Sequence, residues 1–385
     1  MISPYFLQRL VLILSVILAP AAWGAVPPPP QLAAKSWVLM DAASGNVLVD
    51  HQGAMRLPPA SLTKLMTAHV AALELQRGRI KEGDAVTISE KAWRMGGSKM
   101  FVHVGDQIAV SDLLRGIIVQ SGNDASIALA EHLAGGEDTF AVLMNQEAKR
   151  LGLVDTHFLN ATGWPAEGHY SSALDMAKLA RAIVLEDPEH YSMYAEKEFV
   201  WSGIKQPNRN LLLWRDPSVD GLKTGHTEEA GYCLVASSKR DSQRLIAAVF
   251  GTDSEAARAT ETAKLLAYGF NFFETRVFYK KGEAVQAAAI WKGAAPTVKA
   301  GVNADFAMAL PKRTSSEYQA RIVLADEAPV APIAAGTPLG HVEVVDSNGK
   351  VVMLSPLVSL ERIEQGGFFR RVWDSIRLFF KGLFG

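Results

Sequence analysis

The sequence has little of several features that would identify a protein class at once. It contains one cysteine, Cys233, among 385 residues, which excludes a disulfide within one chain and any zinc site of the CxxC type. The formal net charge of −1 gives neither the basic excess of a nucleic-acid-binding protein nor an acidic tail. The 9 histidines lack HExxH or similar spacing, so no metal or other cofactor is indicated. Cys233 is most simply a small core residue in a strand.

The N-terminus also lacks an apolar run long enough to span a bilayer. Residues 10–18 form a short apolar run after Arg9, and Pro20 and small residues follow, a pattern typical of a secretory signal peptide over residues 1–24. A retained membrane anchor is disfavoured, because the run is too short for a hydrocarbon core about 30 Å thick. Residues 25–34, which include VPPPP, are then a stiff extended leader rather than part of the fold. The mature protein is expected to work outside the cytoplasm.

The patterns that are present predict an α/β (α+β) domain over residues 35–275. It begins with a hairpin turning at Ser44-Gly45-Asn46 and continues with a helix after Pro59 that ends near Gly78. Further helices are expected at residues 112–120, 125–134, 139–151, 175–185 and 254–273, and late strands at 219–225, 232–238 and 244–250. Because short turns connect the late strands, the sheet should be largely antiparallel and should join both ends of the domain.

Two further sequence patterns follow, one over residues 276–363 and one over residues 364–385. The first range predicts a small all-β sandwich domain without helices, with a hairpin at Asn348-Gly349. The second predicts an amphipathic helix, in which Arg377 would cost roughly 2.5–3.5 kcal/mol at a bilayer centre. We therefore expect this helix to lie on a membrane surface, detached from the protein by Gly366-Gly367. The alternative is a helix that docks on its own protein.

Three short motifs in the first domain carry the functional signal: Ser61-Leu62-Thr63-Lys64, Ser121-Gly122-Asn123 and Lys223-Thr224-Gly225. Each has a simple structural alternative when taken alone. The first is compatible with an exposed turn at the start of a helix, and the second with a polar cap on the next helix. Together, and in this order, they match the SxxK, SxN and KTG signature of serine acyl-transfer enzymes.

On these motifs the chain resembles, over nearly its whole length, a low-molecular-mass penicillin-binding protein of the D-alanyl-D-alanine carboxypeptidase group. The secretory leader, KTGHT followed by AGY, the β-rich domain and the amphipathic tail share in the resemblance. It implies a β-lactamase/transpeptidase-like domain with an antiparallel sheet and a helical subdomain. The chain has SGN where class A β-lactamases have Ser-Asp-Asn, and it lacks their ExxLN stretch, so it departs from those enzymes.

The resemblance implies roles for the residues of the first two motifs. Ser61 is expected to be the nucleophile at a helix N-terminus, and Lys64 the base one turn later. Burial or nearby cations, with Lys223 and the helix end as the expected sources, must lower the pKa of Lys64 for this purpose. Ser121 is expected to relay a proton to the leaving amine, and Asn123 to hold the substrate amide.

The third motif and the closing helix are expected to bind the rest of the substrate. Lys223 and Thr224 would bind its anionic end, and Gly225 would let its backbone approach closely. Arg258 corresponds by resemblance to a carboxylate-binding arginine, the alternative being an exposed helix arginine. The backbone N–H groups of the nucleophilic serine and of His226 would form the oxyanion hole, with no side-chain role implied for the histidine.

The resemblance therefore implies a serine D,D-carboxypeptidase that removes the terminal D-alanine from peptidoglycan pentapeptide stems through an acyl-enzyme on Ser61. β-Lactams would acylate the same serine. The enzyme is expected in the periplasm, peripherally attached to the outer face of the cytoplasmic membrane by its C-terminal helix. A β-lactamase or a D,D-endopeptidase on the same fold remains an alternative. So does a penicillin-binding scaffold of the cell wall without turnover, although a scaffold has no physical need for Lys64.

Overall fold

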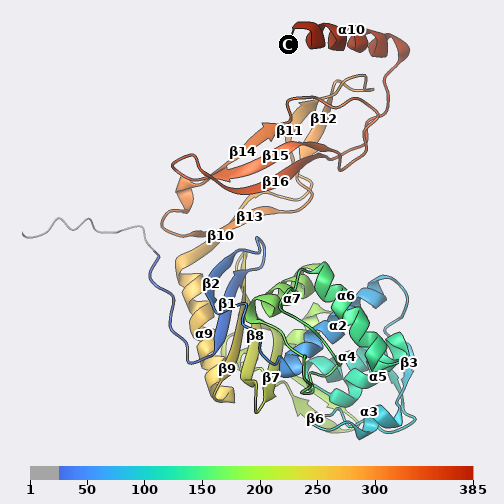
Figure 1. Cartoon of the computed structure of the whole chain (residues 1–385), viewed down its shortest axis with the longest axis vertical. Helices are drawn as coiled ribbons and strands as arrows, with labels where there is room; N and C mark the ends of the chain where they lie inside the picture. Colours follow the sequence, from blue (N-terminus) through green and yellow to red (C-terminus); the bar gives the residue numbers. More distant parts are fainter. Residues whose placement is uncertain (1–25, 385) are drawn as a thin grey trace, which may run out of the picture.

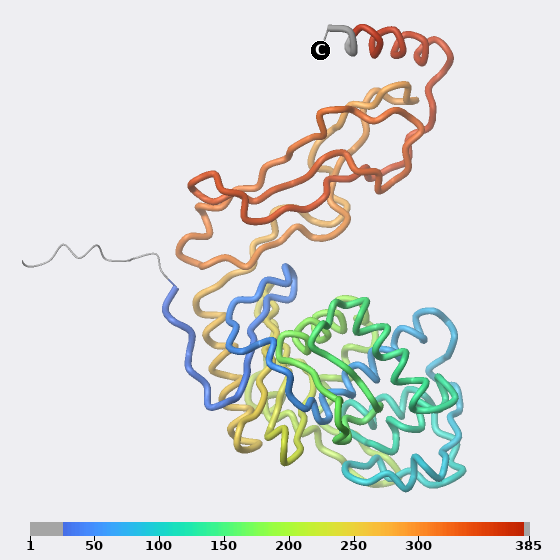
Figure 2. The backbone as a smooth tube through the Cα atoms, viewed as in Figure 1, coloured from blue at the N-terminus to red at the C-terminus, as the bar shows by residue number. Residues whose placement is uncertain are grey.

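The computed structural model describes residues 26–384, which form three parts in succession along the long axis of the molecule (Figures 1 and 2). A mixed α/β domain is followed by a β-rich domain and then by the terminal helix α10. The predicted signal peptide and its cleavage site before Ala25 lie outside the described residues.

A five-stranded antiparallel sheet in the order β2-β1-β9-β8-β7 forms the centre of the first domain. Its strands are β1 (Ser36–Asp41), β2 (Val47–His51), β7 (Val219–Thr227), β8 (Gly231–Arg240) and β9 (Gln243–Thr252). The predicted first hairpin is confirmed, with Gly45 in its turn at φ 76°. As expected, β1 pairs with the late strand β9, so that the sheet joins the two ends of the domain. β7 stands at the edge of the sheet.

The sheet has a hydrophobic core on each face, because successive side chains of a strand point to opposite sides. Val38, Met40, Ile246 and Ala248 belong to one core, and their neighbours Trp37, Leu39, Leu245 and Ala247 to the other. Helix α9 (Glu255–Phe272) covers the second face, while α2 (Thr63–Gln76) and α7 (Ala173–Glu186) contribute to the first core. Cys233 is fully buried in that first core, as predicted for a small core residue in a strand.

The helical part of the domain surrounds α2. Its other helices are α3 (Glu90–Arg94), α4 (Val110–Ile118), α5 (Asn123–Ala134), α6 (Glu137–Arg150) and the short α8 (Leu212–Arg215), and two small ribbons pair β3 (Ala85–Thr87) with β4 (Gln107–Ala109) and β5 (Glu198–Trp201) with β6 (Ile204–Pro207). Every residue of α2 from Thr63 to Ala72 is buried, so the amphipathic pattern of a surface helix does not apply. The helix ends at Arg77, and Gly78 follows at φ 68°, as expected of a glycine that stops a helix.

The segment before β1 is extended, but it is packed on the domain rather than separate from the fold. The hydroxyl of Tyr268 donates to the carbonyl of Pro27 at 2.7 Å, and Ala33 N donates to Glu261 Oε2 at 3.3 Å. Leu32 is buried in the same core as α9. The prediction that residues 25–34 are a leader outside the fold is thus wrong for residues 26–34, because α9 offers both apolar surface and hydrogen-bond partners.

The second domain is built from β-strands and contains no α-helix between residues 273 and 359, all of which are described. A ribbon of β10 (Phe273–Tyr279) and β13 (Phe306–Pro311) lies beside a sheet in the order β11-β12-β16-β15-β14, formed by β11 (Ala284–Ala289), β12 (Thr297–Gly301), β14 (Gln319–Leu324), β15 (Pro338–Val345) and β16 (Val351–Ser359). Both sheets contribute to one core, which includes Phe306, Val298 and Val342. The predicted hairpin at Asn348-Gly349 joins β15 to β16.

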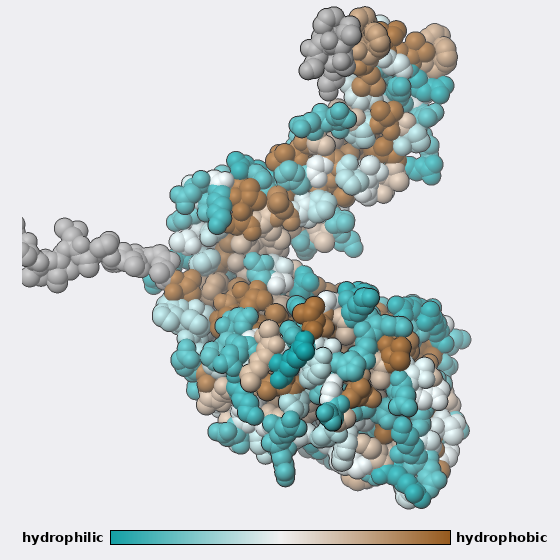
Figure 3. Space-filling view, in the orientation of Figure 1, coloured by the Kyte–Doolittle hydropathy of each residue, from teal (hydrophilic) through white to brown (hydrophobic). Residues whose placement is uncertain are grey.

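Helix α10 (Phe368–Phe384) docks its polar side on the second domain and exposes its apolar side. Asp374 is buried and accepts a hydrogen bond from Lys292 N at 2.7 Å, and Arg377 lies 5.5 Å from the ring centre of Trp291. Gly366 N also donates to Lys292 O, so Gly366-Gly367 does not detach the helix as expected. The apolar residues face away, with Phe369 87% and Trp373 63% exposed, and Figure 3 shows hydrophobic surface at this end. Among residues 26–384, no helix combines the length and apolarity needed to cross a membrane.

Candidate active site

Ser61 lies in a tight turn of 3-10 helix, Ala60–Leu62, directly ahead of α2. Ala60 adopts φ 49°, a left-handed conformation that costs a non-glycine residue roughly 1–2 kcal/mol. Two glycines allow the surroundings to close on this turn. A Cβ on Gly163 would lie 1.7 Å from Ala60 O, and a Cβ on Gly225 would lie 3.0 Å from Pro59 O. The turn that carries Ser61 is therefore held rigidly between two other segments.

Lys64 is buried beneath Ser61, with 1% of its surface exposed. Its Nζ donates to Ser61 Oγ at 3.0 Å and to the carbonyl of Thr162 at 2.6 Å. Burial, followed by the positive charge of Arg209, lowers its pKa to about 7, while Asp124 acts in the opposite direction. The alternative of an exposed helix turn for Ser61 and Lys64 is wrong, because the loop at Thr162 covers the lysine.

Ser121 and Asn123 lie where α4 gives way to α5. Ser121 has φ 68°, and its Oγ is buried without a hydrogen-bond partner among the described residues. Asn123 is the first residue of α5, and its Nδ2 donates to Gly96 O at 2.7 Å. Gly122 is the N-cap of α5 and no side chain caps the helix, so the alternative of a polar cap is also wrong.

The neighbouring Asp124 was not singled out from the sequence, but it fixes the wall of the site. Its carboxylate is buried and accepts from Met100 N at 2.8 Å and from Phe101 N at 2.9 Å. These bonds tie the loop before β4 to the first turn of α5. The position of Asn123 beside Gly96 follows from this connection.

The KTG motif lies on the edge strand β7. Thr224, Gly225, His226 and Thr227 all line the central cleft, although side chains of a strand point alternately to opposite faces. The cleft therefore runs along the open edge of β7. Gly225 faces Pro59 and Leu62, so its lack of a side chain lets the strand approach the turn of Ser61.

Lys223 lies under the cleft and is not part of its lining. Its Nζ donates to the carbonyl of Thr224 at 3.1 Å. Burial, followed by the charges of Lys64, Arg209 and Arg258, lowers its pKa well below the ordinary value. The charges of Lys64 and Lys223 disfavour each other, as expected, and Arg209 is a further cation that lowers the pKa of both lysines.

Two arginines stand at one end of the cleft. Arg258, on α9, is 2% exposed and contacts Gly225 O and Arg209 O, each at 3.4 Å, so it is not the exposed helix arginine of the alternative. Arg209 reaches Ser98 Oγ at 2.8 Å and was missed from the sequence, where nothing marks it. The ring of His226 stacks on Tyr232 with centroids 3.9 Å apart.

The cleft has a volume of about 800 Å³ and brings the predicted residues together. Its lining includes side chains from several distant segments: Ser61, Ser121, Asn123, Trp164, Arg209, Thr224, His226 and Arg258. The segment at Trp164 is a further part that the sequence analysis missed. Asn160 Oδ1 accepts hydrogen bonds from the backbone N–H groups of Thr162, Gly163 and Trp164. Asparagine is typical of such turns, so Asn160 was the sequence signal from which this loop could have been predicted.

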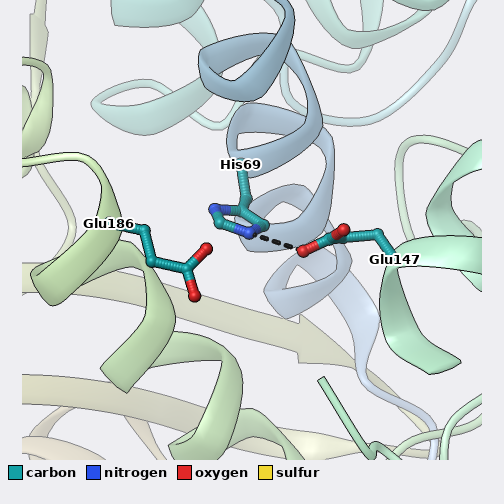
Figure 4. Close-up of side chains that lie close together, drawn as sticks. All are labelled: His69, Glu147 and Glu186. Atoms are coloured by element: carbon teal, nitrogen blue, oxygen red, sulfur yellow. Dashed lines mark hydrogen bonds and ion pairs between the residues drawn. The ribbon is translucent and has the colours of Figure 1, made fainter. Parts of the chain in front are cut away.

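A second cluster of titratable groups lies behind the site, where α2, α6 and α7 meet (Figure 4). His69 Nε2 is 3.0 Å from Glu147 Oε1, and Glu186 lies on the other side of the ring. Arg150 donates to Glu147 at 2.6 Å and to Glu186 at 2.5 Å. Because this guanidinium pairs with both carboxylates and His69 also contacts Glu147, the cluster is explained as an ion-pair network between helices.

The geometry is typical of a class: a serine hydroxyl 3.0 Å from a buried lysine of lowered pKa, with two arginines in the same cleft, is the arrangement expected of a serine acyl-transfer hydrolase. Residues 24–254 match the family described as D-alanyl-D-alanine carboxypeptidase, and residues 273–365 match penicillin-binding protein 5, C-terminal domain. The chain belongs to the D-alanyl-D-alanine carboxypeptidase family. The predicted resemblance, fold class and enzyme class are confirmed, and the protein is a serine-type D-alanyl-D-alanine carboxypeptidase.

Three known proteins illustrate the similarity. D-alanyl-D-alanine carboxypeptidase DacC of Escherichia coli (strain K12) is 41% identical over 92% of this chain and 90% of its own length. The structure of penicillin binding protein 5 from Haemophilus influenzae has a TM-score of 0.80 at 41% identity, covering 88% of this chain and 99% of that one. Penicillin-binding protein D2 from Listeria monocytogenes, solved in the ampicillin-bound form, has a TM-score of 0.58 at 28% identity, covering 63% and 100%.

Proposed function

We propose that Ser61 attacks the penultimate D-alanine carbonyl of a peptidoglycan pentapeptide stem, with Lys64 as the base. The single observation that carries this proposal is the 3.0 Å contact between Ser61 Oγ and a lysine whose pKa is about 7. A base with this pKa is half neutral at physiological pH and can accept the hydroxyl proton. The Oγ–C bond forms as that proton moves to Lys64 Nζ.

The tetrahedral intermediate then loses the terminal D-alanine. Its oxyanion is bound by the backbone N–H groups of Ser61 and His226. The C–N bond breaks, and Ser121 relays a proton to the leaving amine; its buried, unpartnered Oγ supports this role. Asn123 holds the substrate amide. Water finally hydrolyses the acyl-enzyme, which restores Ser61 and releases the shortened stem.

The anionic end of the substrate lies toward Thr224 and Arg258, and the positive charge of Arg209 also attracts it. Both arginines line the cleft, whereas Lys223 acts from below it. A bound carboxylate raises the pKa of Lys223 and so strengthens its contribution when substrate is present. β-Lactams acylate the same serine, since they present a carbonyl beside a carboxylate; the ampicillin-bound relative supports this assignment.

We place the enzyme in the periplasm, attached to the outer face of the cytoplasmic membrane by α10. The exposed aromatic side of the helix supports this position, since each apolar side chain that enters the interface contributes roughly 1.5–3 kcal/mol. Arg371, which is exposed on α10, adds about 1 kcal/mol near an anionic leaflet.

The test is D-alanine release from a purified pentapeptide by the wild-type protein and by Ser61→Ala. Wild type should release D-alanine and become labelled by a fluorescent penicillin, and the variant should do neither. Ser126→Ala, a buried serine on α5 that donates to Gly122 O, serves as a control for general loss of structure. Penicillin labelling that survives in Ser61→Ala would overturn the assignment of the nucleophile.

A further inference from the structure

A second groove of about 510 Å³ continues from the catalytic cleft. The two share the lining residues Gly163, Trp164, Pro165, Thr227 and Glu229. The groove extends from there over Leu57 and Pro58 to Arg56 and Tyr170. None of these outer residues has a part in the proposed chemistry at Ser61.

The walls of this groove are fixed before any ligand binds. Leu57 and Ser171 exchange backbone hydrogen bonds of 2.8 and 2.9 Å across one wall. Arg56 Nε donates to Asp155 at 3.0 Å, and its guanidinium lies 4.8 Å from the ring centre of Tyr170. A ligand therefore loses little free energy in ordering the site.

The buried His169 joins the floor of the groove to the catalytic helix. Leu159 N donates to its Nδ1 at 3.2 Å, so Nε2 carries the proton and donates to Thr63 Oγ1 at 2.9 Å. Burial lowers the pKa of His169 to about 4, which keeps the ring neutral and this arrangement unchanged at neutral pH.

Trp164 marks the boundary between cleft and groove. Its indole packs against the opposite wall, where a Cβ on Gly97 would lie 3.2 Å from Cζ3, yet the residue is 47% exposed. The hydrogen bonds from Asn160 hold its backbone. A rigid, half-exposed aromatic ring at this place offers contact area to a chain that passes from one cavity to the other.

The direction of the substrate follows from β7. With the carboxylate end at Thr224, a strand paired antiparallel to the open edge runs back toward Thr227. Each extended residue covers about 3.3 Å, so the third residue from the end lies about 7 Å from the last one, beside His226 and Thr227. The next part of the peptide then reaches the shared boundary at Trp164 and enters the second groove.

The rim of the groove favours a cationic side chain. Glu167 and Glu229 are exposed, and neither carboxylate has an ion-pair partner among the described residues, whereas Arg56 is already paired with Asp155. An amine on the third residue from the end would pass close to Glu229. Exposed pairs of this kind contribute modestly, so the expected effect is a few-fold.

We propose that this second groove binds the stem residues that precede D-alanyl-D-alanine, with Trp164 as the contact surface and the glutamates selecting a side-chain amine. The inference rests on the proposed function, because the catalytic cleft sets the register of the peptide. The groove then gives the enzyme its preference for long stem peptides over short peptides.

The experiment compares kcat/KM for acetyl-D-Ala-D-Ala with kcat/KM for L-Ala-γ-D-Glu-L-Lys-D-Ala-D-Ala. Wild type should prefer the pentapeptide at least tenfold. Trp164→Ala should lower that preference at least fivefold, and Arg56→Ala should lower it at least threefold. Acetylation of the lysine amine should lower kcat/KM two- to fivefold in wild type and not in a Glu167→Gln, Glu229→Gln double variant.

Arg276→Ala is the matched control, since this exposed arginine also lies 4.8 Å from an aromatic ring centre, that of Phe278, but in the second domain. It should keep the wild-type preference. Equal kcat/KM values for the two peptides in wild type, or an unchanged preference in both groove variants, would overturn the inference.

Calorimetric titration of Ser61→Ala with the pentapeptide separates this question from catalysis. Trp164→Ala in that background should raise Kd at least fivefold, whether or not the assigned catalytic roles are correct. Lack of D-alanine release from both peptides would count against the proposed function, whereas a Kd that Trp164→Ala leaves unchanged would count against the groove.

Discussion

The rate at which penicillin acylates Ser61 should follow the neutral form of Lys64 as the pH is changed. Lowering the pKa of this lysine from 10.5 to about 7 corresponds to roughly 5 kcal/mol against the ammonium form. About half of the molecules then hold a neutral base at pH 7, compared with roughly one in 3,000 for an unperturbed lysine. Because protonation removes the base, the rate should fall as the pH falls. At pH 5 it should be about one fiftieth of the rate at pH 7.

The second-order rate constant for labelled penicillin, measured from pH 5 to pH 9 at constant ionic strength, tests this expectation. Its logarithm should rise with a slope near one up to about pH 7 and level off above. Since Arg209 lowers the pKa of Lys64, Arg209→Gln should move the midpoint to higher pH. Lys99→Gln, which removes a partly buried lysine whose Nζ donates to Trp93 O, should leave the midpoint unchanged.

A profile that is flat from pH 5 to pH 9, or one with its midpoint above pH 9, would refute the assignment of Lys64 as the base. An unchanged midpoint in Arg209→Gln would leave the base in place but contradict the electrostatic cause. The midpoint is the informative quantity, because Arg209 also lines the cleft and its loss lowers the rate itself.

Two further predictions concern the catalytic turn and the tail. Gly163→Ala should cost at least about 3 kcal/mol of stability and most of the activity, because its Cβ would lie 1.7 Å from Ala60 O. Gly168→Ala is the control, since it has a similar φ of 86° but no neighbour within 3.8 Å, and thermal unfolding should show a loss of only about 1 kcal/mol. Deleting residues 367–385 should move the enzyme from the membrane to the soluble fraction with unchanged penicillin labelling. Membrane association that persists after the deletion would exclude α10 as the anchor.

Local chemistry explains what could be predicted from the sequence. The Ser44-Gly45-Asn46 turn, the Asn348-Gly349 hairpin and the glycine after α2 follow from residues adjacent in the chain. The three motifs were recognisable because each is short and carries its own side chains. Their meeting in one cleft required only the predicted order of strands and helices.

Contacts between distant segments explain what could not be predicted. Lys64 can be buried because the carbonyl of Thr162, 98 residues later, accepts a hydrogen bond from its Nζ, and Arg209 lowers its pKa from a loop without periodicity. The docking of residues 26–34 on α9, and of α10 through Asp374, likewise depends on a few contacts between residues far apart in the chain. Neither composition nor periodicity contains such information.

The open edge of β7 also has a consequence for the solubility of the protein. An edge strand with unpaired backbone groups is a template for pairing with other chains, and proteins usually protect it with charges or covering segments. Here Ser61 and residues 162–165 line the same cleft as the strand and flank its open edge. The walls that admit one extended peptide therefore also keep a neighbouring β-sheet out, so that substrate selection and resistance to aggregation depend on the same residues.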